Sequence, residues 1–250
     1  MGRIPLEAGM TVLDARVPRG RPSLRVSETF TGTVQGEGLS TGVPASFIRL
    51  ALCNLSCRDC DTPYTWDTSR FDLRRESTWQ EAGHLVEWAL AQPEQLVVVT
   101  GGEPLLQPDV LPLVQGLRAG GREVEIETNG TVVPAPELVA AGPWFNVSPK
   151  LSGFGEGMPQ DRRIVPDALR ILSASGQARW KFVVRTPGEL PEIADLESAY
   201  GLAPISVMPE GTTAEAVLEG MRVLVGPVAE RGWRLGTRLH VLLWGDQRGR

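Results

Sequence analysis

The sequence predicts an α/β domain built on a parallel sheet, arranged as an open or partial barrel. Strand-like and helix-like segments alternate along most of the chain, which is the pattern of βαβ units. About six such units fit, which is too few for a complete eight-fold barrel. Residues 1–27, rich in Pro, Gly and Arg, are expected to form an N-terminal arm, and residues 28–250 a single domain.

The predicted strands are short, apolar or β-branched, and bounded by Gly, Pro or Asn. They cover residues 45–52, 95–100, 123–128, 144–148, 179–185, 205–208 and 234–243. The predicted helices lie mostly between them, at residues 78–91, 108–119, 135–141, 166–175, 190–200 and 213–231. Capping-box patterns at 77–81 (Ser-Thr-Trp-Gln-Glu) and 212–215 (Thr-Thr-Ala-Glu) support two of these helix starts. In such folds the chemistry sits on loops at the carboxyl ends of the strands.

Charge and hydropathy exclude several classes of protein. The 25 Lys and Arg residues against 30 Asp and Glu give a net charge of −5, which argues against a general nucleic-acid binder. No run of 18 apolar residues is present, so no membrane-spanning helix is expected. The first residues lack the apolar stretch of a signal peptide, which favours a cytoplasmic location.

Three cysteines, the full complement of the chain, follow the first predicted strand as Cys53-x3-Cys57-x2-Cys60. An odd number rules out complete internal pairing, and thiolates are soft ligands suited to zinc or to iron–sulfur clusters. Structural zinc requires four ligands, and His84, in a helical segment, is the only nearby candidate for the fourth. Three thiolates suit a 4Fe-4S cluster with one open iron. Zinc, or three reduced core cysteines, are the alternatives.

The cysteine loop resembles that of the radical S-adenosylmethionine (SAM) enzymes. A second stretch, 97–104 (Val-Val-Val-Thr-Gly-Gly-Glu-Pro), is similar to the segment that holds the amino group of SAM in that superfamily. Glycine permits close backbone approach, and Glu103 and strand-end carbonyls can accept hydrogen bonds from an ammonium. Taken alone, this stretch would be an ordinary turn before the next helix.

Further motifs are similar to one family within it, 7-carboxy-7-deazaguanine synthase, from about residue 28 to the C-terminus. They are 28–38, which contains Gln-Gly-Glu-Gly, 44–50 (Pro-Ala-Ser-Phe-Ile-Arg-Leu), 60–66 (Cys-Asp-Thr-Pro-Tyr-Thr-Trp), 126–130 (Ile-Glu-Thr-Asn-Gly) and 148–151 (Ser-Pro-Lys-Leu). The resemblance implies a partial (β/α)6-type radical SAM barrel. It also implies a carbon–nitrogen lyase that converts 6-carboxy-5,6,7,8-tetrahydropterin to 7-carboxy-7-deazaguanine, toward queuosine, with loss of ammonia. The cofactors would be a 4Fe-4S cluster, SAM used catalytically, and Mg²⁺.

The resemblance also assigns roles to individual residues of this sequence. Cys53, Cys57 and Cys60 would ligate three irons, and Thr62 would bind Mg²⁺. The SAM contacts would be Asp59, Cys60, Asp61, Gly102, Glu103, Ser148, Pro149 and Lys150, together with Met208, Pro209, Glu210 and Gly211, where the sequence departs from the usual Gln-Pro form. The substrate contacts would be Val34, Gln35, Gly36, Glu37, Arg49, Thr100 and His240.

Some of these assignments have plain structural alternatives. Thr62 could be a turn residue before Pro63, Arg49 could belong to a structural ion pair, and His240 could be a core residue of the last predicted strand. A glycyl-radical-enzyme activating protein or a non-catalytic zinc module are the alternative functions. The family resemblance further implies a homodimer and an electron donor such as a flavodoxin or ferredoxin.

Overall fold

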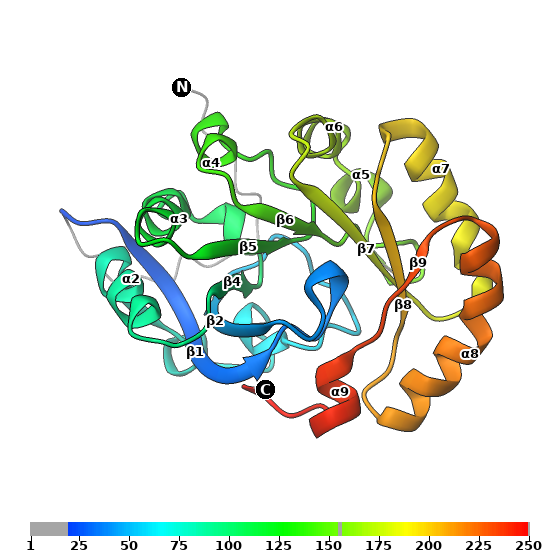
Figure 1. Cartoon of the computed structure of the whole chain (residues 1–250), viewed down its shortest axis with the longest axis horizontal. Coiled ribbons are helices and arrows are strands. Elements are labelled where there is room, and N and C mark those ends of the chain that lie inside the picture. The colour runs from blue at the N-terminus through cyan, green and yellow to red at the C-terminus, as the bar shows by residue number, and fades with distance from the viewer. Residues whose placement is uncertain (1–19, 155–156, 250) are drawn as a thin grey trace.

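A computed structural model describes residues 20–154 and 157–249, and residues 1–19 of the predicted N-terminal arm lie outside this part. The strands form one nine-stranded sheet in the order β3-β1-β2-β4-β5-β6-β7-β8-β9. The sheet curves, and the longer helices surround its outer face (Figure 1). Because β3 and β9 remain the two edges in the described part of the chain, the fold is an open partial barrel, as predicted.

The strands are β1 (Ser23–Val34), β2 (Pro44–Leu50), β3 (Thr78–Glu81), β4 (Leu96–Gly101), β5 (Glu123–Thr128), β6 (Trp144–Val147), β7 (Ala178–Val184), β8 (Ile205–Pro209) and β9 (Arg234–Leu235). The helices are α1 (Leu73–Glu76), α2 (Ala82–Leu90), α3 (Val110–Ala119), α4 (Pro136–Ala140), α5 (Gln160–Arg163), α6 (Pro166–Ala174), α7 (Leu190–Tyr200), α8 (Ala214–Glu230) and α9 (Leu239–Trp244). No described helix is long and apolar enough to span a membrane.

Every neighbouring pair from β2 to β9 is parallel, whereas β1 pairs antiparallel with both β2 and β3. Seven strands in parallel are joined by six connections, which confirms the predicted number of βα units. The carboxyl ends of these strands therefore meet at one rim of the sheet, where loops can converge on a site.

Strand β1 was not predicted. It begins at Ser23, so residues 23–27 of the expected N-terminal arm lie in the sheet. Its sequence mixes polar and apolar residues, and its pairing with β2 shifts register between Val26 and Glu28 and again between Phe30 and Thr33. Bulges of this kind break the period-2 pattern by which a strand is recognised.

The predicted helix start at residue 78 was wrong. Residues Thr78–Glu81 form β3, which pairs with the first four residues of β1, and α2 begins only at Ala82. Glu81 precedes α2 without a capping hydrogen bond from its side chain. Pairing with an unpredicted strand therefore outweighed the local capping-box pattern.

The predicted strand 234–243 was also wrong beyond its first residues. β9 covers only Arg234–Leu235, and residues Leu239–Trp244 form helix α9. The backbone N–H of Gly236 bonds to the Val207 carbonyl, after which the chain leaves the sheet, and the N–H of Leu239 bonds to the Gly36 carbonyl. A run of apolar residues cannot by itself distinguish a short helix from a strand.

The two faces of the sheet differ in chemistry. Along β7, Trp180 and Phe182 are buried in the core that the sheet forms with the outer helices, whereas Lys181 points to the concave face. β5 repeats the pattern, with Ile126 in the core and Glu127 on the concave side. The convex face therefore stabilises the fold, and the concave face carries charged groups that can serve a site.

A buried carboxylate, Glu94, holds the turn within β1 and gives a test of the fold. It accepts hydrogen bonds from Thr31 Oγ1 (2.7 Å), Gly32 N (2.9 Å) and Ser46 Oγ (2.8 Å). Burial alone would raise its pKa, but these donors outweigh burial and lower the pKa to about 2. A carboxylate whose pKa is lower in the folded state stabilises the fold at pH values above its unfolded-state pKa. This stabilisation is lost as the pH falls through the folded-state pKa.

We expect Glu94→Gln to lower the free energy of unfolding by about 1–2 kcal/mol at pH 7, since solvent screening reduces the full effect of the pKa shift. Between about pH 5 and pH 2 the wild-type chain should lose this difference, so the two denaturation curves should converge. Urea denaturation across this range measures it, with the exposed Glu219→Gln as the control. Parallel pH profiles for Glu94→Gln and wild type would contradict the assignment.

Candidate active site

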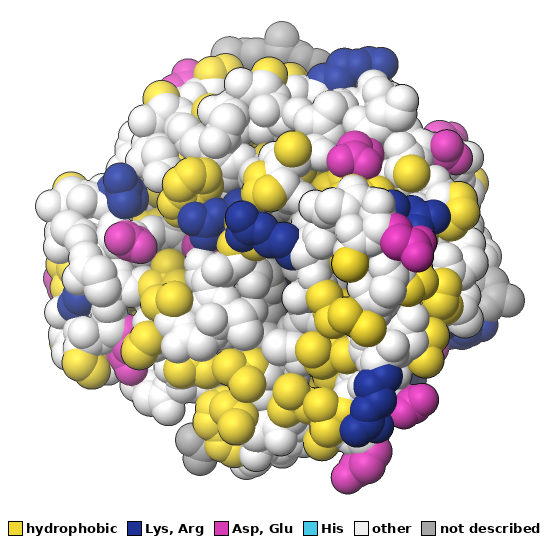
Figure 2. Space-filling view, turned by 45° about the vertical axis from the view of Figure 1, so that its right-hand side comes forward, with side chains coloured by type: hydrophobic (Ala, Val, Ile, Leu, Met, Phe, Trp, Pro, Cys, Tyr) yellow, Lys and Arg dark blue, Asp and Glu magenta, His cyan; other side chains and the backbone are white. Residues whose placement is uncertain are grey.

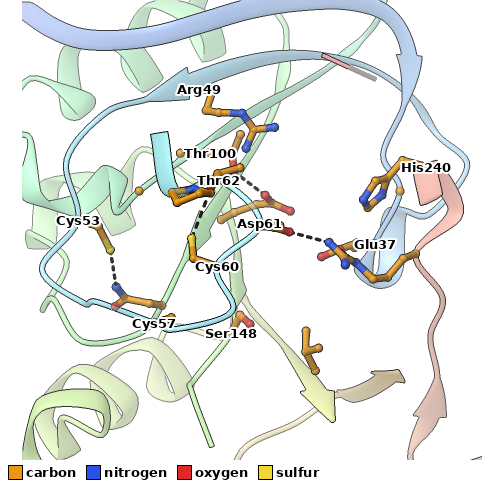
Figure 3. A pocket seen from close by; sticks show the side chains of 18 of the residues that line it. Glu37, Arg49, Cys53, Cys57, Cys60, Asp61, Thr62, Thr100, Ser148 and His240 are labelled. Atoms are coloured by element: carbon orange, nitrogen blue, oxygen red, sulfur yellow. Dashed lines mark hydrogen bonds and ion pairs between the residues drawn. The ribbon is translucent and has the colours of Figure 1, made fainter. Parts of the chain in front are cut away.

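A cavity of about 740 Å³ opens at the carboxyl-end rim of the parallel strands. Most of the predicted site residues line it, as Figure 3 shows for ten of them. The predicted residues in its wall are Val34, Gln35, Gly36, Glu37, Arg49, Cys53, Cys57, Asp59, Cys60, Asp61, Thr62, Thr100, Gly102, Ser148, Lys150, Glu210 and His240. Motifs separated by up to about 200 positions therefore meet in one space, as expected for strand-end loops.

The three cysteines lie on the loop between β2 and α1 and border the same side of the cavity (Figure 3). Cys57 is buried, and Cys53 and Cys60 are partly buried. The Leu55 backbone N–H donates to Cys53 Sγ and the Trp66 indole Nε1–H to Cys60 Sγ, both at 3.4 Å. Burial raises the pKa of the Cys53 thiol to about 12, so this thiol must lose its proton when it binds iron.

The Gly101-Gly102 pair lets the end of β4 approach the end of β2 closely. Gly101 has φ of +138°, and a Cβ on it would lie 2.0 Å from the Leu50 carbonyl oxygen. A Cβ on Gly102 would lie 2.1 Å from the Leu52 carbonyl oxygen. Both positions therefore require glycine, and this contact fixes the loop that carries Cys53.

Glu103 follows this pair but does not line the cavity. Its carboxylate is fully buried and accepts hydrogen bonds from Thr128 Oγ1 (2.9 Å) and the backbone N–H groups of Asn129 (2.7 Å) and Leu105 (3.0 Å). Burial raises its pKa to about 7 despite these donors. In this structure Glu103 joins the ends of β4 and β5, rather than facing the cavity as the motif suggested.

A network of charges, buried except at Asp61, forms another part of the wall. Lys181 Nζ contacts Glu37 Oε2 at 2.7 Å and Glu127 Oε1 at 3.0 Å. Arg238 Nε contacts Glu37 Oε1 at 3.0 Å, and its Nη2 contacts Asp61 Oδ2 at 2.6 Å. This network joins β5 and β7 to the Gln-Gly-Glu-Gly loop and to the cysteine loop.

Glu37 and Lys181 hold each other in their charged forms. Burial raises the pKa of Glu37, but Lys181 and Arg238 outweigh burial and hold that pKa well below its usual range. Burial likewise lowers the pKa of Lys181, but the carboxylates of Glu127 and Glu37 raise it above its usual value. These two residues therefore present fixed charges to the cavity.

Arg49 reaches the cavity from β2. Its Nε donates to Glu28 Oε1 at 2.7 Å, and no hydrogen bond from its two terminal nitrogens is found in the described part of the chain. Figure 3 shows its guanidinium directed into the cavity. The ion pair considered as an alternative therefore exists, and it leaves the forked end of Arg49 available for an anion.

His240 lies on α9, not on a strand, and reaches the cavity beside the Gln-Gly-Glu-Gly loop. A Cβ on Gly36 would lie only 2.2 Å from His240 Nδ1, so the glycine makes room for the imidazole. Burial lowers the pKa of His240, which favours the neutral ring at pH 7.

Ser148 and Lys150 line the cavity near the cysteines, with Lys150 Nζ donating to Ser148 Oγ at 3.1 Å. Five predicted contact residues lie outside the wall: Glu103, Pro149, Met208, Pro209 and Gly211. Met208 lies on the face of β8 opposite to the core residues Ile205 and Val207, but it is fully buried and does not line the cavity. Glu210 reaches the wall and pairs with Arg185 Nε at 2.6 Å.

The comparisons with known proteins agree with this geometry. The sequence model of the Radical SAM superfamily matches residues 48–152. A 7-carboxy-7-deazaguanine synthase from Pyrobaculum aerophilum is 37% identical, over 92% of this chain and 98% of the relative. The chain belongs to the 7-carboxy-7-deazaguanine synthase family. A relative of the same name from Rhodopirellula baltica is 36% identical, over 94% of this chain and 91% of its own length.

A solved structure supports this family in three dimensions. The crystal structure of QueE from Escherichia coli matches with a TM-score of 0.64 and 27% identity, covering 86% of this chain and 93% of that one. Streptococcus suis SuiB matches with a TM-score of 0.53 at 16% identity, which concerns the fold alone. The alternatives of a glycyl-radical-enzyme activating protein and a zinc module are not favoured by these relatives.

Membership of this family and of the Radical SAM superfamily implies a 4Fe-4S cluster and SAM. The donor set fits the cluster, because three thiols from one loop face one cavity. Within the described residues, no three His, Cys, Asp or Glu side chains converge as a single metal ion would require. His84, the one candidate for a fourth zinc ligand, lies exposed on α2 away from the cavity.

Several cavity residues were not predicted from the sequence, chiefly Glu127, Lys181 and Arg238. A signal for them was present. Glu127 and Lys181 are charged residues inside predicted parallel strands, where a buried charge must find a partner. Arg238 is likewise a charged residue inside a predicted strand, but that strand ends at Leu235, so its true position could not be predicted.

Proposed function

We propose that this chain is a 7-carboxy-7-deazaguanine synthase, a radical SAM lyase that contracts the ring of 6-carboxy-5,6,7,8-tetrahydropterin with loss of ammonia. The observation that carries the proposal is a single cavity in which three thiols from one loop face Arg49 and a polar wall. Relatives of this name at 36–37% identity over nearly the whole chain support the same reaction. When bound, the reduced cluster and SAM supply the radical that takes a hydrogen atom from the pterin.

The chain's own residues bind and orient the reactants. In the proposal, Arg49 binds the substrate carboxylate through its free terminal nitrogens. Gln35 and Glu37 face the pterin edge, which presents both donors and acceptors, with Val34, Gly36, Thr100 and His240 around them. The Thr100 hydroxyl is already directed by its 2.6 Å bond to Glu127 Oε2.

We assign SAM to the side of the cavity that holds Asp59, Asp61, Gly102, Ser148, Lys150 and Glu210. Glu103 contributes indirectly, because its carboxylate binds Thr128 and Asn129 and so ties the end of β4 to the end of β5. Pro149, Met208, Pro209 and Gly211 shape this side from behind the wall. Gly211, for example, accepts a hydrogen bond from Arg238 Nη1 at 2.8 Å.

The proposal includes Mg²⁺ at Thr62. Its hydroxyl lines the cavity and lies 3.7 Å from Cys60 Sγ, on the loop that faces Arg49. A hydroxyl is a weak ligand for this hard cation, so the substrate carboxylate and water must complete the coordination. Mg²⁺ binding should therefore depend on the pterin carboxylate.

We also propose redox and protein partners and a cellular location for the chain. An electron donor such as a flavodoxin or ferredoxin would reduce the cluster. Thiolate ligands require a reducing compartment, which supports the cytoplasm. A homodimer is proposed as in the family expectation. Exposed apolar side chains on α8 and α9, namely Leu218, Val223, Val225 and Leu243, offer a contact surface, and Figure 2 shows hydrophobic side chains gathered in the lower half of this face.

An anaerobic assay tests the proposed function. The reconstituted chain is given the carboxytetrahydropterin, SAM, a reductant, and either Mg²⁺ or a chelator, and the product is detected by mass spectrometry. We expect the deazaguanine, with less formed in the chelator. Absence of product while the cluster is intact and SAM is bound would refute the proposal.

Gly36→Ala tests the placement of His240 in the substrate site. The new Cβ would meet His240 Nδ1 at 2.2 Å, so the imidazole must move, and we expect kcat/KM for the pterin to fall roughly 100-fold. The cluster content should not change, since the atoms nearest to the new Cβ belong to His240 and not to a cysteine. Gly226→Ala, which adds a Cβ to open space on α8, is the matched control. An unchanged kcat/KM would contradict the assignment.

A further inference from the structure

The C-terminal segment after α9 returns across the sheet to the cavity. Asp246, Gln247, Arg248 and Gly249 all line the cavity wall. Figure 1 shows this segment ending beside the end of β1. No motif in the sequence assigned a role to these residues, although they line the cavity.

Arg248 anchors the segment through three contacts. Its Nε donates to Glu28 Oε2 on β1 at 2.9 Å, and its Nη1 donates to Glu76 Oε2 on α1 at 2.9 Å. Its guanidinium carbon lies 3.8 Å from the centre of the Tyr64 ring, a cation–π contact. These three contacts distinguish Arg248 from an exposed arginine that makes a single surface ion pair.

Glu28 is the shared partner that connects Arg248 to the substrate site. Its Oε2 is held by Arg248, while its Oε1 accepts from Arg49 Nε at 2.7 Å and from Tyr64 OH at 2.9 Å. Glu28 and Arg49 are cross-strand neighbours in the β1–β2 ladder, so they would meet in any case. Arg248 therefore decides how they meet.

The geometry of the arginine–carboxylate pair explains why this matters. A carboxylate with both oxygens free favours a bidentate fork with arginine, which would engage a terminal nitrogen of Arg49. Arg248 draws Oε2 of Glu28 toward the C-terminal segment, so the carboxylate turns Oε1 toward Arg49, which pairs with it through Nε alone. The terminal nitrogens of Arg49 thus stay directed into the cavity.

We propose that Arg248 is a positioning residue that holds Glu28 so that the forked end of Arg49 faces the carboxylate of the substrate. The inference rests on the proposed function, since it needs a carboxylated pterin in this cavity. Its specific consequence is that Arg248 contributes to the recognition of the carboxylate and not of the pterin ring.

Two ligands separate these contributions. Binding of 6-carboxytetrahydropterin and of tetrahydropterin without the carboxylate is measured by anaerobic calorimetry on the chain loaded with cluster and SAM. We expect Arg248→Ala to weaken binding of the carboxylated ligand roughly tenfold, as for loss of one charge-assisted contact, and to leave the other ligand unchanged. In turnover, KM should rise while kcat stays within about twofold.

The controls keep the test decisive. Arg170→Ala removes a comparable exposed arginine, which pairs with Asp167 and lies over the Tyr200 ring, and it should change neither affinity. A chain ending at Gly245 should repeat the selective loss. Equal weakening of both ligands, or no weakening in Arg248→Ala and in the shortened chain, would overturn the inference. If the wild-type chain itself neither binds nor converts the carboxylated pterin, the proposed function fails instead.

Discussion

Replacing Lys181 by methionine is expected to lower the free energy of unfolding by about 3–5 kcal/mol. The ammonium is nine-tenths buried between the carboxylates of Glu37 and Glu127. Methionine fills a similar volume but cannot pair with them, so two carboxylates would remain in a low-dielectric space with one balancing cation fewer. Removing one partner of a buried network costs more than the network contributes, because the remaining charges stay desolvated.

The pH dependence of Lys181→Met follows from the same charges. Without the ammonium, burial and mutual repulsion should raise the pKa values of Glu37 and Glu127. A carboxylate with a raised pKa stabilises the fold at low pH and loses that stabilisation as the pH rises. The deficit of the variant should therefore shrink as the pH is lowered from about 8 to about 5.

Urea denaturation of the anaerobically purified chain measures this difference. Arg222→Met, in an exposed pair with Glu219 on α8, is the matched control and should change stability by less than about 0.5 kcal/mol. Adding Glu127→Gln to Lys181→Met should recover part of the loss, since it removes one of the unpaired charges. A deficit no larger than that of the control would show that the network is not buried as described.

The same network shows where prediction from sequence stops. Alternation of strands and helices predicts the parallel sheet, because each helix returns the chain to the end of the sheet at which the previous strand began. The loops after β2 and β4 were predictable from their Cys, Gly and Glu spacing. Glu127 lies in the 126–130 motif and Lys181 in a predicted strand, but their pairing depends on how far the sheet curls, which no local pattern encodes.

The wrong predictions of secondary structure at the two ends of the sheet have a common cause. β1 and β3 depend on each other: residues 78–81 form a strand only because Ser23–Val26 lie beside them. At the other end, residues 239–244 form a helix because the sheet ends at β9 and the chain instead bonds to Gly36. In each case a distant partner decides the local conformation, and local propensity is too weak to oppose it.

Cys57→Ala is expected to abolish product formation and to remove the iron–sulfur cluster. Cys57 is the buried member of the three thiols and packs in a small apolar cluster with Leu55 and Met158. Two thiolates cannot hold a cluster that needs three protein ligands, so iron and acid-labile sulfide should fall from about four per chain to background. Iron and sulfide analysis after anaerobic reconstitution, with the visible absorbance, measures the loss.

The neighbouring substitution Ser56→Ala separates ligand loss from damage to the loop. Ser56 is exposed, and only its backbone N–H contacts Met158 Sδ, at 3.5 Å, so the side chain can be removed without changing that contact. Ser56→Ala should keep cluster and turnover. Retained turnover in Cys57→Ala would contradict the ligand assignment, and one tightly held zinc without sulfide in the wild-type chain would contradict the cluster itself. Because Arg49, Glu37 and Lys181 lie on other elements, Cys57→Ala should leave them in place. An unfolding midpoint close to that of the cluster-free wild-type chain would then make lost activity a statement about the cluster.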